Sequence, residues 1–170
     1  MTDQGRRDQF LETEGDFPLE EVLSLPLMAH LATASALGPR VSPVWFLWEE
    51  GAMWFAGRNS DTFPKRIRET PECAVGTVEF DPQRGMLRHV GMRGAAEVVP
   101  LDSARLQRLL RRYLGNDPTA WSTSFRKGVV EKLDLMVRFT PASIVARDQS
   151  YFSPASPRQY PCEGLDGSSL

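Results

Sequence analysis

The sequence has few of the residues from which metal centres and disulfides are built. Its 170 residues include two cysteines, Cys73 and Cys162, and two histidines, His30 and His89. The cysteines lie far apart and form no CxxC pair, which favours free thiols in a reducing compartment over a disulfide or a metal site. Two histidines are too few for a histidine-rich metal centre. We therefore predict a protein without a metal site.

Long apolar runs and an excess of positive charge are also missing. No apolar run approaches the roughly 20 residues that a membrane-spanning helix needs, and the polar residues 1–14 do not resemble a secretory signal. The net charge is -2, whereas a general nucleic-acid binder relies on a strong basic field. We expect a cytoplasmic protein that binds neither membranes nor nucleic acid.

The composition divides the chain into a central domain and two polar ends. Residues 1–15 are charged and show no periodicity, which predicts a mobile arm. Residues 149–170 are rich in Ser, Pro and Gly and are expected to form a tail. Residues 16–148 alternate apolar and polar segments and are long enough to form one domain with a substantial core.

The densest aromatic segment of the chain is 41–48, with the sequence VSPVWFLW. Its β-branched and aromatic residues predict a strand, which the turn at 49–51 connects to a second strand at 52–56. Pro43 cannot donate to a ladder and should lie at a strand edge or an irregularity. Such a concentration of Trp and Phe indicates either a barrel core or a flat aromatic ligand beside the strand.

Several other segments are predicted to be strands, and most of them are joined by tight turns: 27–34, 73–80, 86–99, 133–139 and 143–147. In the segment 86–99, Val90 and Met92 are expected on one face, and His89 and Arg93 on the other. Helices are expected between the strands, the longest of them from Asp102 or Ser103 to Leu114. We predict an antiparallel barrel of about six strands, with helices at its ends and sides.

A polar loop follows the second aromatic strand and leads into a short helix. Hydroxyls, backbone amides and cations gather at this helix start, where an anion is stabilised by the helix dipole and by free N–H groups. An ordinary capped helix start with solvated charges is the alternative. The residues concerned are Arg58, Asn59, Ser60, Thr62, Lys65 and Arg66.

An ordered series of loose motifs runs through most of the chain. It comprises a small apolar strand ending LAT (31–33), a Gly-Pro turn, VSPVWF (41–46), PECAV (71–75), VGMRGAAE (90–97), Trp121 and a last strand near 140–141. Over residues 20–148 the series resembles the pyridoxamine 5′-phosphate oxidase-like superfamily of flavin-binding split barrels.

The resemblance implies a six-stranded antiparallel split barrel that forms a homodimer, with two FMN molecules at the subunit interface. The isoalloxazine ring would lie along Ser42, Pro43, Val44, Trp45 and Phe46. The phosphate would lie near Arg58, Asn59, Ser60 and Thr62, with charge from Lys65 or Arg66, and Trp121 would approach from the partner subunit or else anchor its helix. In typical members the basic phosphate ligand stands further ahead of the proline that corresponds to Pro71 than Lys65 does, so the choice of cation and of flavin stays open.

Several other polar or reactive side chains could be functional or structural. His89 and Arg93 share a strand face with Gly91 between them, and could hold substrate or be solvated or interfacial. His30 is expected to be a core histidine. The arginines at 105–112 are expected to form a solvated helix face, and Cys73 an inert thiol.

The leading hypothesis is an FMN-dependent oxidoreductase that acts on a small organic substrate. A flavin supplies the redox chemistry itself, which agrees with the lack of a Ser/His/Asp series or carboxylate pair. Oxidation of pyridoxamine phosphate is disfavoured, because the C-terminal end offers only Arg158 for a second phosphate. The alternatives are a deazaflavin-dependent reductase on the same fold, a non-catalytic flavin- or haem-binding stress-related protein, and a barrel without a cofactor.

Overall fold

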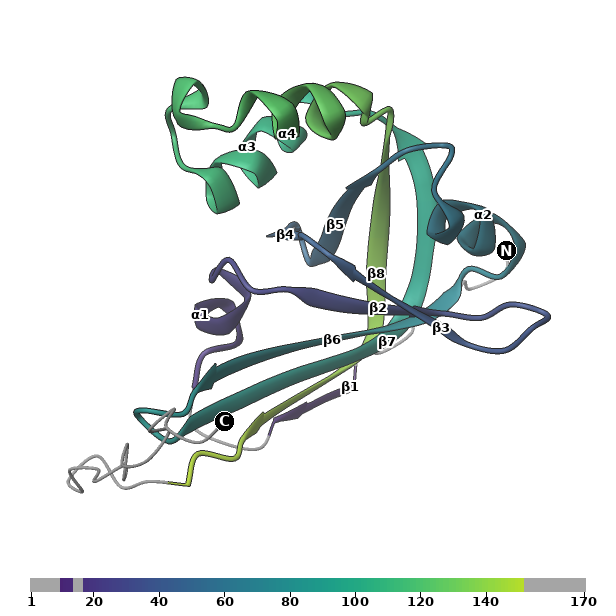
Figure 1. Cartoon of the computed structure of the whole chain (residues 1–170). Coiled ribbons are helices and arrows are strands. Elements are labelled where there is room, and N and C mark those ends of the chain that lie inside the picture. Colours follow the sequence, from purple (N-terminus) through teal and green to yellow (C-terminus); the bar gives the residue numbers. More distant parts are fainter. Residues whose placement is uncertain (1–9, 14–16, 152–170) are drawn as a thin grey trace, which may run out of the picture.

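The computed structural model describes residues 10–13 and 17–151, which form one strongly curled sheet with helices around it (Figure 1). The strands run in the order β3-β2-β6-β7-β8-β5-β4 with antiparallel neighbours, and β1 pairs in parallel with β8. Their bounds are β1 (Phe10–Thr13), β2 (Ala29–Thr33), β3 (Arg40–Val44), β4 (Leu47–Glu49), β5 (Ala52–Gly57), β6 (Glu72–Asp81), β7 (Met86–Pro100) and β8 (Leu135–Asp148).

The helices lie at one end of the curled sheet and along its sides. Figure 1 shows α3 and α4 together over one end, and α2 beside the β2–β3 hairpin. The helices are α1 (Leu19–Leu23), α2 (Thr62–Glu69), α3 (Ser103–Leu114) and α4 (Thr123–Gly128), with 3-10 turns η1 (Pro118–Ala120) and η2 (Val130–Lys132). Among the described residues, no helix has the length and apolar character that crossing a membrane requires.

The sheet is an open barrel whose two edges are neighbours in the chain. β3 and β4 are the outermost strands of the sheet order, and only Trp45 and Phe46 connect them. The predicted position of Pro43 is confirmed, because β3 is an edge strand and a proline there interrupts no interior ladder. We call the gap between β3 and β4 the split of the barrel.

The predicted antiparallel class is confirmed for seven strands, but the expected count of about six is too low. The aromatic segment 41–48 is two strands rather than one, because the chain leaves one edge of the sheet at Val44 and joins the other at Leu47. The two strands expected at 133–139 and 143–147 are one continuous strand, β8. β1 lies within the predicted N-terminal arm. Residues 1–9, 14–16 and the tail from 152 lie outside the described residues.

β7 is the longest strand, and its predicted facing is confirmed. Val90 and Met92 are buried in the core, whereas His89 and Arg93 point to the outer face. The register between β7 and β8 shifts between Arg93 and Gly94. A Cβ at Gly94 would stand 2.1 Å from the Thr140 carbonyl oxygen, so the close backbone approach requires glycine.

The core consists of two packed clusters on the inner side of the curled sheet. The larger contains three fully buried phenylalanines: Phe46 from the split, Phe55 from β5 and Phe139 from β8. The second lies between the sheet and α3, which contributes the buried side chains of Leu106, Leu109 and Leu110. Aromatic residues of the segment 45–55 thus serve mainly as core, which was the structural alternative.

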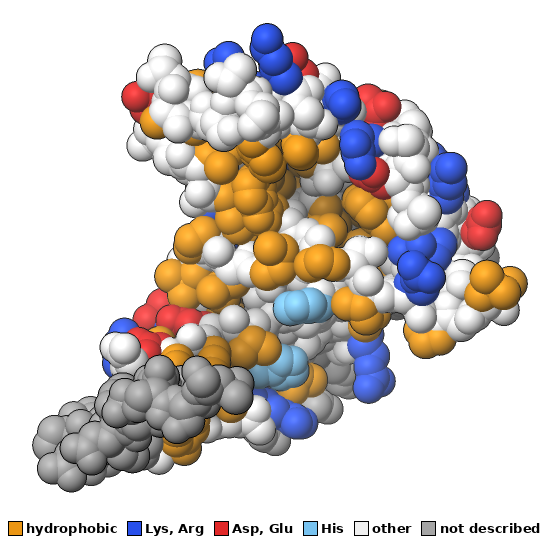
Figure 2. Space-filling model, viewed as in Figure 1, with side chains coloured by type: hydrophobic (Ala, Val, Ile, Leu, Met, Phe, Trp, Pro, Cys, Tyr) orange, Lys and Arg blue, Asp and Glu red, His pale blue; other side chains and the backbone are white. Residues whose placement is uncertain are grey.

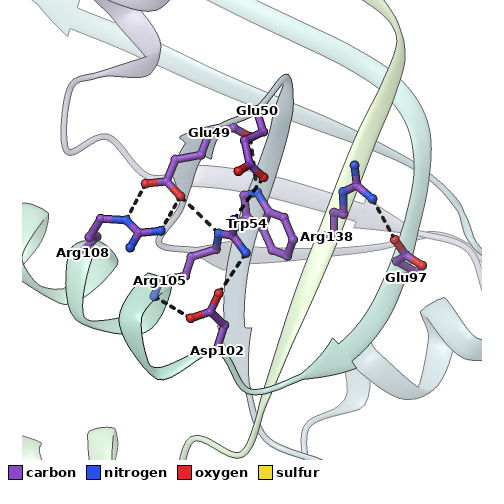
Figure 3. A network of polar contacts seen from close by, with 8 residues as sticks. All are labelled: Glu49, Glu50, Trp54, Glu97, Asp102, Arg105, Arg108 and Arg138. Carbon is purple, nitrogen blue, oxygen red and sulfur yellow. Dashed lines mark hydrogen bonds and ion pairs between the residues drawn. The ribbon is translucent and has the colours of Figure 1, made fainter.

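A network of charges fixes α3 on the β4–β5 hairpin (Figure 3). Asp102 caps α3 by accepting from Arg105 N–H, as predicted, and also pairs with the Arg105 guanidinium at 3.1 Å. The Arg105 guanidinium contacts Glu49 and Glu50 at 3.2 Å each and lies 3.7 Å above the centre of the Trp54 ring. Arg108 pairs with Glu49 at 2.7 Å.

The prediction of a solvated arginine face on α3 is therefore wrong for Arg105 and Arg112, whereas Arg108 and Arg111 are exposed as predicted. Arg105 is largely covered by its partners, and Arg112 donates to the carbonyls of Leu23 and Leu25 and lies against the ring of Phe46. Spacing alone identified a polar face. It could not reveal that acidic hairpin residues and carbonyls ending α1 would cover that face.

Candidate functional site

A hollow lined by apolar side chains lies at the split, below α3 and α4 (Figure 2). We call it the aromatic recess; it has a volume of about 310 Å³ and is bordered by Pro43, Val44, Trp45, Arg58, Leu109 and Phe125. This volume is at the lower end of the roughly 300–1,000 Å³ typical of small-molecule sites. The recess brings together three residues of the predicted ring-binding strand and one residue of the predicted phosphate loop.

Trp45 is the largest side chain at the recess, and part of its surface is already covered. Its ring stacks on Tyr113 with centroids 4.6 Å apart and planes 4° from parallel, and Phe125 lies 5.7 Å away at 43°. A flat ligand could therefore not occupy the Trp45 face that Tyr113 covers. Any ring bound here lies against Pro43, Val44 and the remaining surface of the aromatic cluster.

Tyr113 also provides hydrogen-bond partners for backbone groups at the split, where the sheet ladder is interrupted. Its hydroxyl accepts from Phe46 N–H at 3.0 Å and donates to the Leu27 carbonyl at 2.7 Å. Burial raises the pKa of the Tyr113 hydroxyl, so it stays protonated and can donate. Phe46 itself points into the core, so the structure places its side chain away from the recess.

The predicted cation Arg66 lies against two hydroxyls beside the β2–β3 hairpin. Its Nε donates to Thr33 Oγ1 at 2.7 Å, and a terminal nitrogen donates to Ser42 Oγ at 3.3 Å. A guanidinium carries five N–H donors, so this arrangement leaves donors for a further acceptor. Lys65, the other predicted cation, is exposed and has no hydrogen bond or ion pair within the described part of the chain.

The loop before α2 is bonded largely to protein groups. Asp61 precedes α2 but does not cap it; its carboxylate accepts from Arg58 N–H at 2.9 Å and pairs with the Arg58 guanidinium at 2.7 Å. This pairing raises the pKa of Arg58. Asn59 N–H donates to Asp134 at 2.8 Å, and its side-chain oxygen accepts from Arg68 at 2.7 Å.

Three further predicted residues lie apart from these groups. Ser60 and Thr62 are exposed at the start of α2. Trp121 packs in the second cluster beneath α3, with its Nε1 buried and without a hydrogen-bond partner among the described residues. Its packing agrees with the alternative in which Trp121 anchors its helix, and the approach to a partner's cofactor stays a prediction.

A second hollow lies on the outer face of the sheet, across β2, β6, β7 and β8. We call it the sheet recess; it has a volume of about 470 Å³, and His30, His89 and Arg93 are among its lining residues. Its floor includes Gly76 and Gly91, which pair with each other. The prediction that His30 is a core histidine is wrong, because odd and even positions of β2 face opposite sides and His30 falls on the outer one.

Neither cysteine nor metal chemistry is supported by the described residues. Burial raises the pKa of the Cys73 thiol to about 12, which keeps it protonated and inert at neutral pH, as predicted. Within residues 10–13 and 17–151, no group of three or more His, Cys, Asp or Glu side chains could hold a metal ion.

Comparison with known proteins rests on structure alone. No protein-family model and no curated protein sequence matches the chain. A conserved hypothetical protein of Mycobacterium tuberculosis superposes with a TM-score of 0.60 at 20% identity, covering 78% of this chain and 86% of the other. An F420 reductase superposes with a TM-score of 0.59 at 24% identity, covering 76% of this chain and 98% of the other. A FAD-binding protein of Mesorhizobium loti superposes with a TM-score of 0.54 at 20% identity, covering 76% of this chain and 89% of the other.

The chain has the split-barrel fold. The predicted resemblance to the pyridoxamine 5′-phosphate oxidase-like proteins is thereby confirmed for the fold. A haem storage protein of Vibrio cholerae has the same split-barrel fold, with a TM-score of 0.54 at 16% identity, covering 72% and 87%.

Four residues of this split barrel that border or support the candidate groups were missed in the sequence. Tyr113 and Phe125 come from helices far along the chain, and no local pattern places them beside Trp45. Thr33 and Arg40 pair with each other across the β2–β3 hairpin, on the strand face that carries Ser42. The hairpin itself was predicted, so alternation along its two strands could have identified both.

Proposed function

We propose that this protein is a cytoplasmic, FMN-dependent oxidoreductase that acts on a small organic substrate. The observation that carries the proposal is the layout of β3. Val44 borders the apolar recess, and Ser42, two residues away on the same strand face, contacts Arg66. Two residues of a strand span about 6–7 Å. A flat ring joined by a short polyol chain to a phosphate matches this order of apolar wall and cationic end.

The residues would divide the binding of FMN between them. Pro43, Val44 and Trp45 would cover part of the ring and exclude water from it, while Arg66 and Ser42 would donate to the phosphate. Arg66 is favoured over Lys65 because two hydroxyls hold its guanidinium in place. A bound flavin supplies the hydride or electron transfer, and the chain positions it.

A second copy of the chain is proposed to complete the site. Val41, Val78 and Phe80 are large apolar side chains exposed on the outer sheet face. Large exposed apolar surfaces of this kind mark interaction sites. Pro43 lines the aromatic recess and its cross-strand partner His30 lines the sheet recess, so a second copy on this face would border both.

The deazaflavin coenzyme is the second candidate, and the position of Arg40 favours it. Arg40 lies two residues before Ser42 on the same strand face and is exposed. Its guanidinium has no bonded partner among the described residues. The longer acidic tail of a deazaflavin coenzyme could extend from Arg66 to Arg40. The F420 reductase among the structural neighbours gives this candidate further support.

The test is a titration of the purified protein with FMN and with the deazaflavin coenzyme, followed by fluorescence. Charge-assisted hydrogen bonds are worth about 1.5–3 kcal/mol, so we expect Arg66→Gln to weaken FMN binding by roughly 10- to 100-fold. Arg68→Gln is the matched control, since Arg68 lies on the same helix but bonds Asn59. Arg40→Gln should weaken the deazaflavin coenzyme more than FMN if the second candidate holds.

Equal FMN affinity in the Arg66→Gln and wild-type proteins would contradict the phosphate assignment. Failure of both cofactors to bind would remove the proposed function.

A further inference from the structure

The sheet recess is lined by basic groups and lacks acidic ones. Two rows of paired residues cross it: His30–Gly76–Gly91–Val145, and Ala32–Ala74–Arg93–Ser143. Apart from Arg93, the two central strands contribute only Gly76, Gly91 and Ala74 to these rows, so small residues form much of the floor. Arg93, Arg147 and both histidines line the recess, and no Asp or Glu does. Figure 2 shows the histidine side chains beside hydrophobic ones on the surface of the molecule.

Arg93 differs from most arginines of the described chain in having no protein partner. Arg58, Arg88 and Arg105 pair with carboxylates, and Arg66 and Arg112 donate to hydroxyls or carbonyls. The Arg93 guanidinium has neither a hydrogen bond nor an ion pair among the described residues. Glu72, which borders a neighbouring hollow together with Arg93, does not pair with it. The Arg93 donors are therefore available to a ligand.

The His89 ring lies over the floor of the recess. A Cβ at Gly91 would stand 3.0 Å from His89 Cε1 and 3.4 Å from Nε2, so the imidazole lies directly over Gly91. At Gly76 a Cβ would be 4.0 Å from Nε2, an ordinary contact. Glycine at 91 thus allows an imidazole position that a methyl group would displace.

We propose that the sheet recess binds a small planar organic carboxylate, with Arg93 as its principal partner and His89 beside it. A guanidinium fork matches a carboxylate with two parallel N–H···O bonds. A planar body held by Arg93 would lie beside the His89 ring, over the small side chains of Ala32 and Ala74 in the same row as Arg93. In one respect the proposal rests on the proposed function: because His30 and Pro43 join the two recesses, we infer that the bound anion is the substrate of the neighbouring flavin.

Binding of benzoate to the full chain, measured by calorimetry, tests the proposal. We expect saturable binding of benzoate and none of benzamide, its neutral counterpart, at the same concentration. Arg93→Gln should weaken benzoate binding at least tenfold, and Arg93→Lys should recover part of it, because lysine keeps the charge but not the fork. The control is Arg111→Gln, an exposed arginine on α3, which should change nothing.

The two glycines provide a second, matched pair of variants. Gly91→Ala should weaken benzoate binding several-fold by displacing the His89 ring, whereas Gly76→Ala should leave it unchanged. Circular dichroism and thermal midpoints establish that each variant is folded. Equal binding of benzoate and benzamide, or full benzoate affinity in Arg93→Gln, would overturn the proposal.

An FMN titration of the same variants separates this proposal from the proposed function. We expect Arg93→Gln to bind FMN as the wild type does. If wild-type protein binds benzoate through Arg93 but binds neither FMN nor the deazaflavin coenzyme, the carboxylate site stands and the proposed function fails. If it binds FMN but not benzoate, the carboxylate site alone fails.

Discussion

Tyr113 connects the packing of the split to the geometry of the candidate site. Its ring covers one side of Trp45, and its hydroxyl bonds both Phe46 and Leu27. Because Phe46 lies between two strands and has no ladder partner there, the hydroxyl replaces the bonds that the sheet would otherwise supply. The position of Trp45 at the recess therefore depends on a residue 68 positions along the chain.

Tyr113→Phe should keep the stack on Trp45 and lose both hydrogen bonds. Leaving a buried donor or acceptor unpaired costs about 1–3 kcal/mol, and we expect a loss of that size in the free energy of unfolding, measured in urea. Tyr113→Leu removes the ring as well and should cost more. If Tyr113→Phe is as stable as the wild type, the hydroxyl does not support the split.

At the level of single residues, the sequence identified the candidate cations but could not choose between them. Lys65 and Arg66 are adjacent and both cationic, and only the packing of α2 against the β2–β3 hairpin turns Arg66 toward Thr33 and Ser42. Asp61 stands at the N-cap position of α2, but its carboxylate pairs with Arg58 and makes no capping hydrogen bond. Local sequence patterns indicate which types of residue gather in a loop, whereas the partners of each side chain depend on contacts between distant segments.

Helix α3 forms one wall of the aromatic recess, and Glu49 holds it to the β4–β5 hairpin. The hydrogen bond from Arg108 is the main cause that lowers the pKa of Glu49 below its ordinary 4.5; burial opposes it, and Arg105 adds to the lowering. A carboxyl group whose pKa is lower in the folded state stabilises that state above its unfolded pKa. This stabilisation is lost as the pH falls through the lowered value.

The difference in unfolding free energy between wild type and Glu49→Gln should therefore be largest near neutral pH and shrink as the pH falls below about 4.5. Urea unfolding at a series of pH values measures it. In an Arg108→Gln background the same comparison should vary less with pH, because the main partner is gone. A difference that does not change with pH would contradict the role assigned to Glu49.

Among the elements, those with strong local signals were predicted well. The helix at α3, the alternation of β7 and the turn at 49–51 follow from capping, periodicity and glycine. The division of 41–48 into two strands, β3 and β4, was not predicted. A continuous run of β-forming residues carries no signal that the chain passes from one edge of the sheet to the other. The continuity of β8 was not predicted, because Pro141 and Ala142 lie between the two expected strands and indicated an interruption.

At the scale of the molecule, the antiparallel open barrel was predicted from the order of its motifs, and the comparisons confirm the fold. The aromatic recess, the Arg66 group and the sheet recess all adjoin β3 or its neighbour β2. In our proposal, a second copy on the outer face would border the two recesses, whereas the Arg66 group lies on the opposite strand face with Ser42. Cofactor binding is therefore coupled to dimer formation in our proposal: the site is complete only in the dimer, whereas the dimer itself does not require the cofactor.

Sedimentation velocity of the FMN-loaded protein, recorded at the flavin absorbance band, tests this coupling most directly. We predict that flavin sediments with a species of twice the 19.1 kDa chain mass, at one flavin per chain, and that Arg66→Gln carries less flavin while remaining dimeric. Flavin that remains unsedimented, or that sediments with a monomer, would contradict the account.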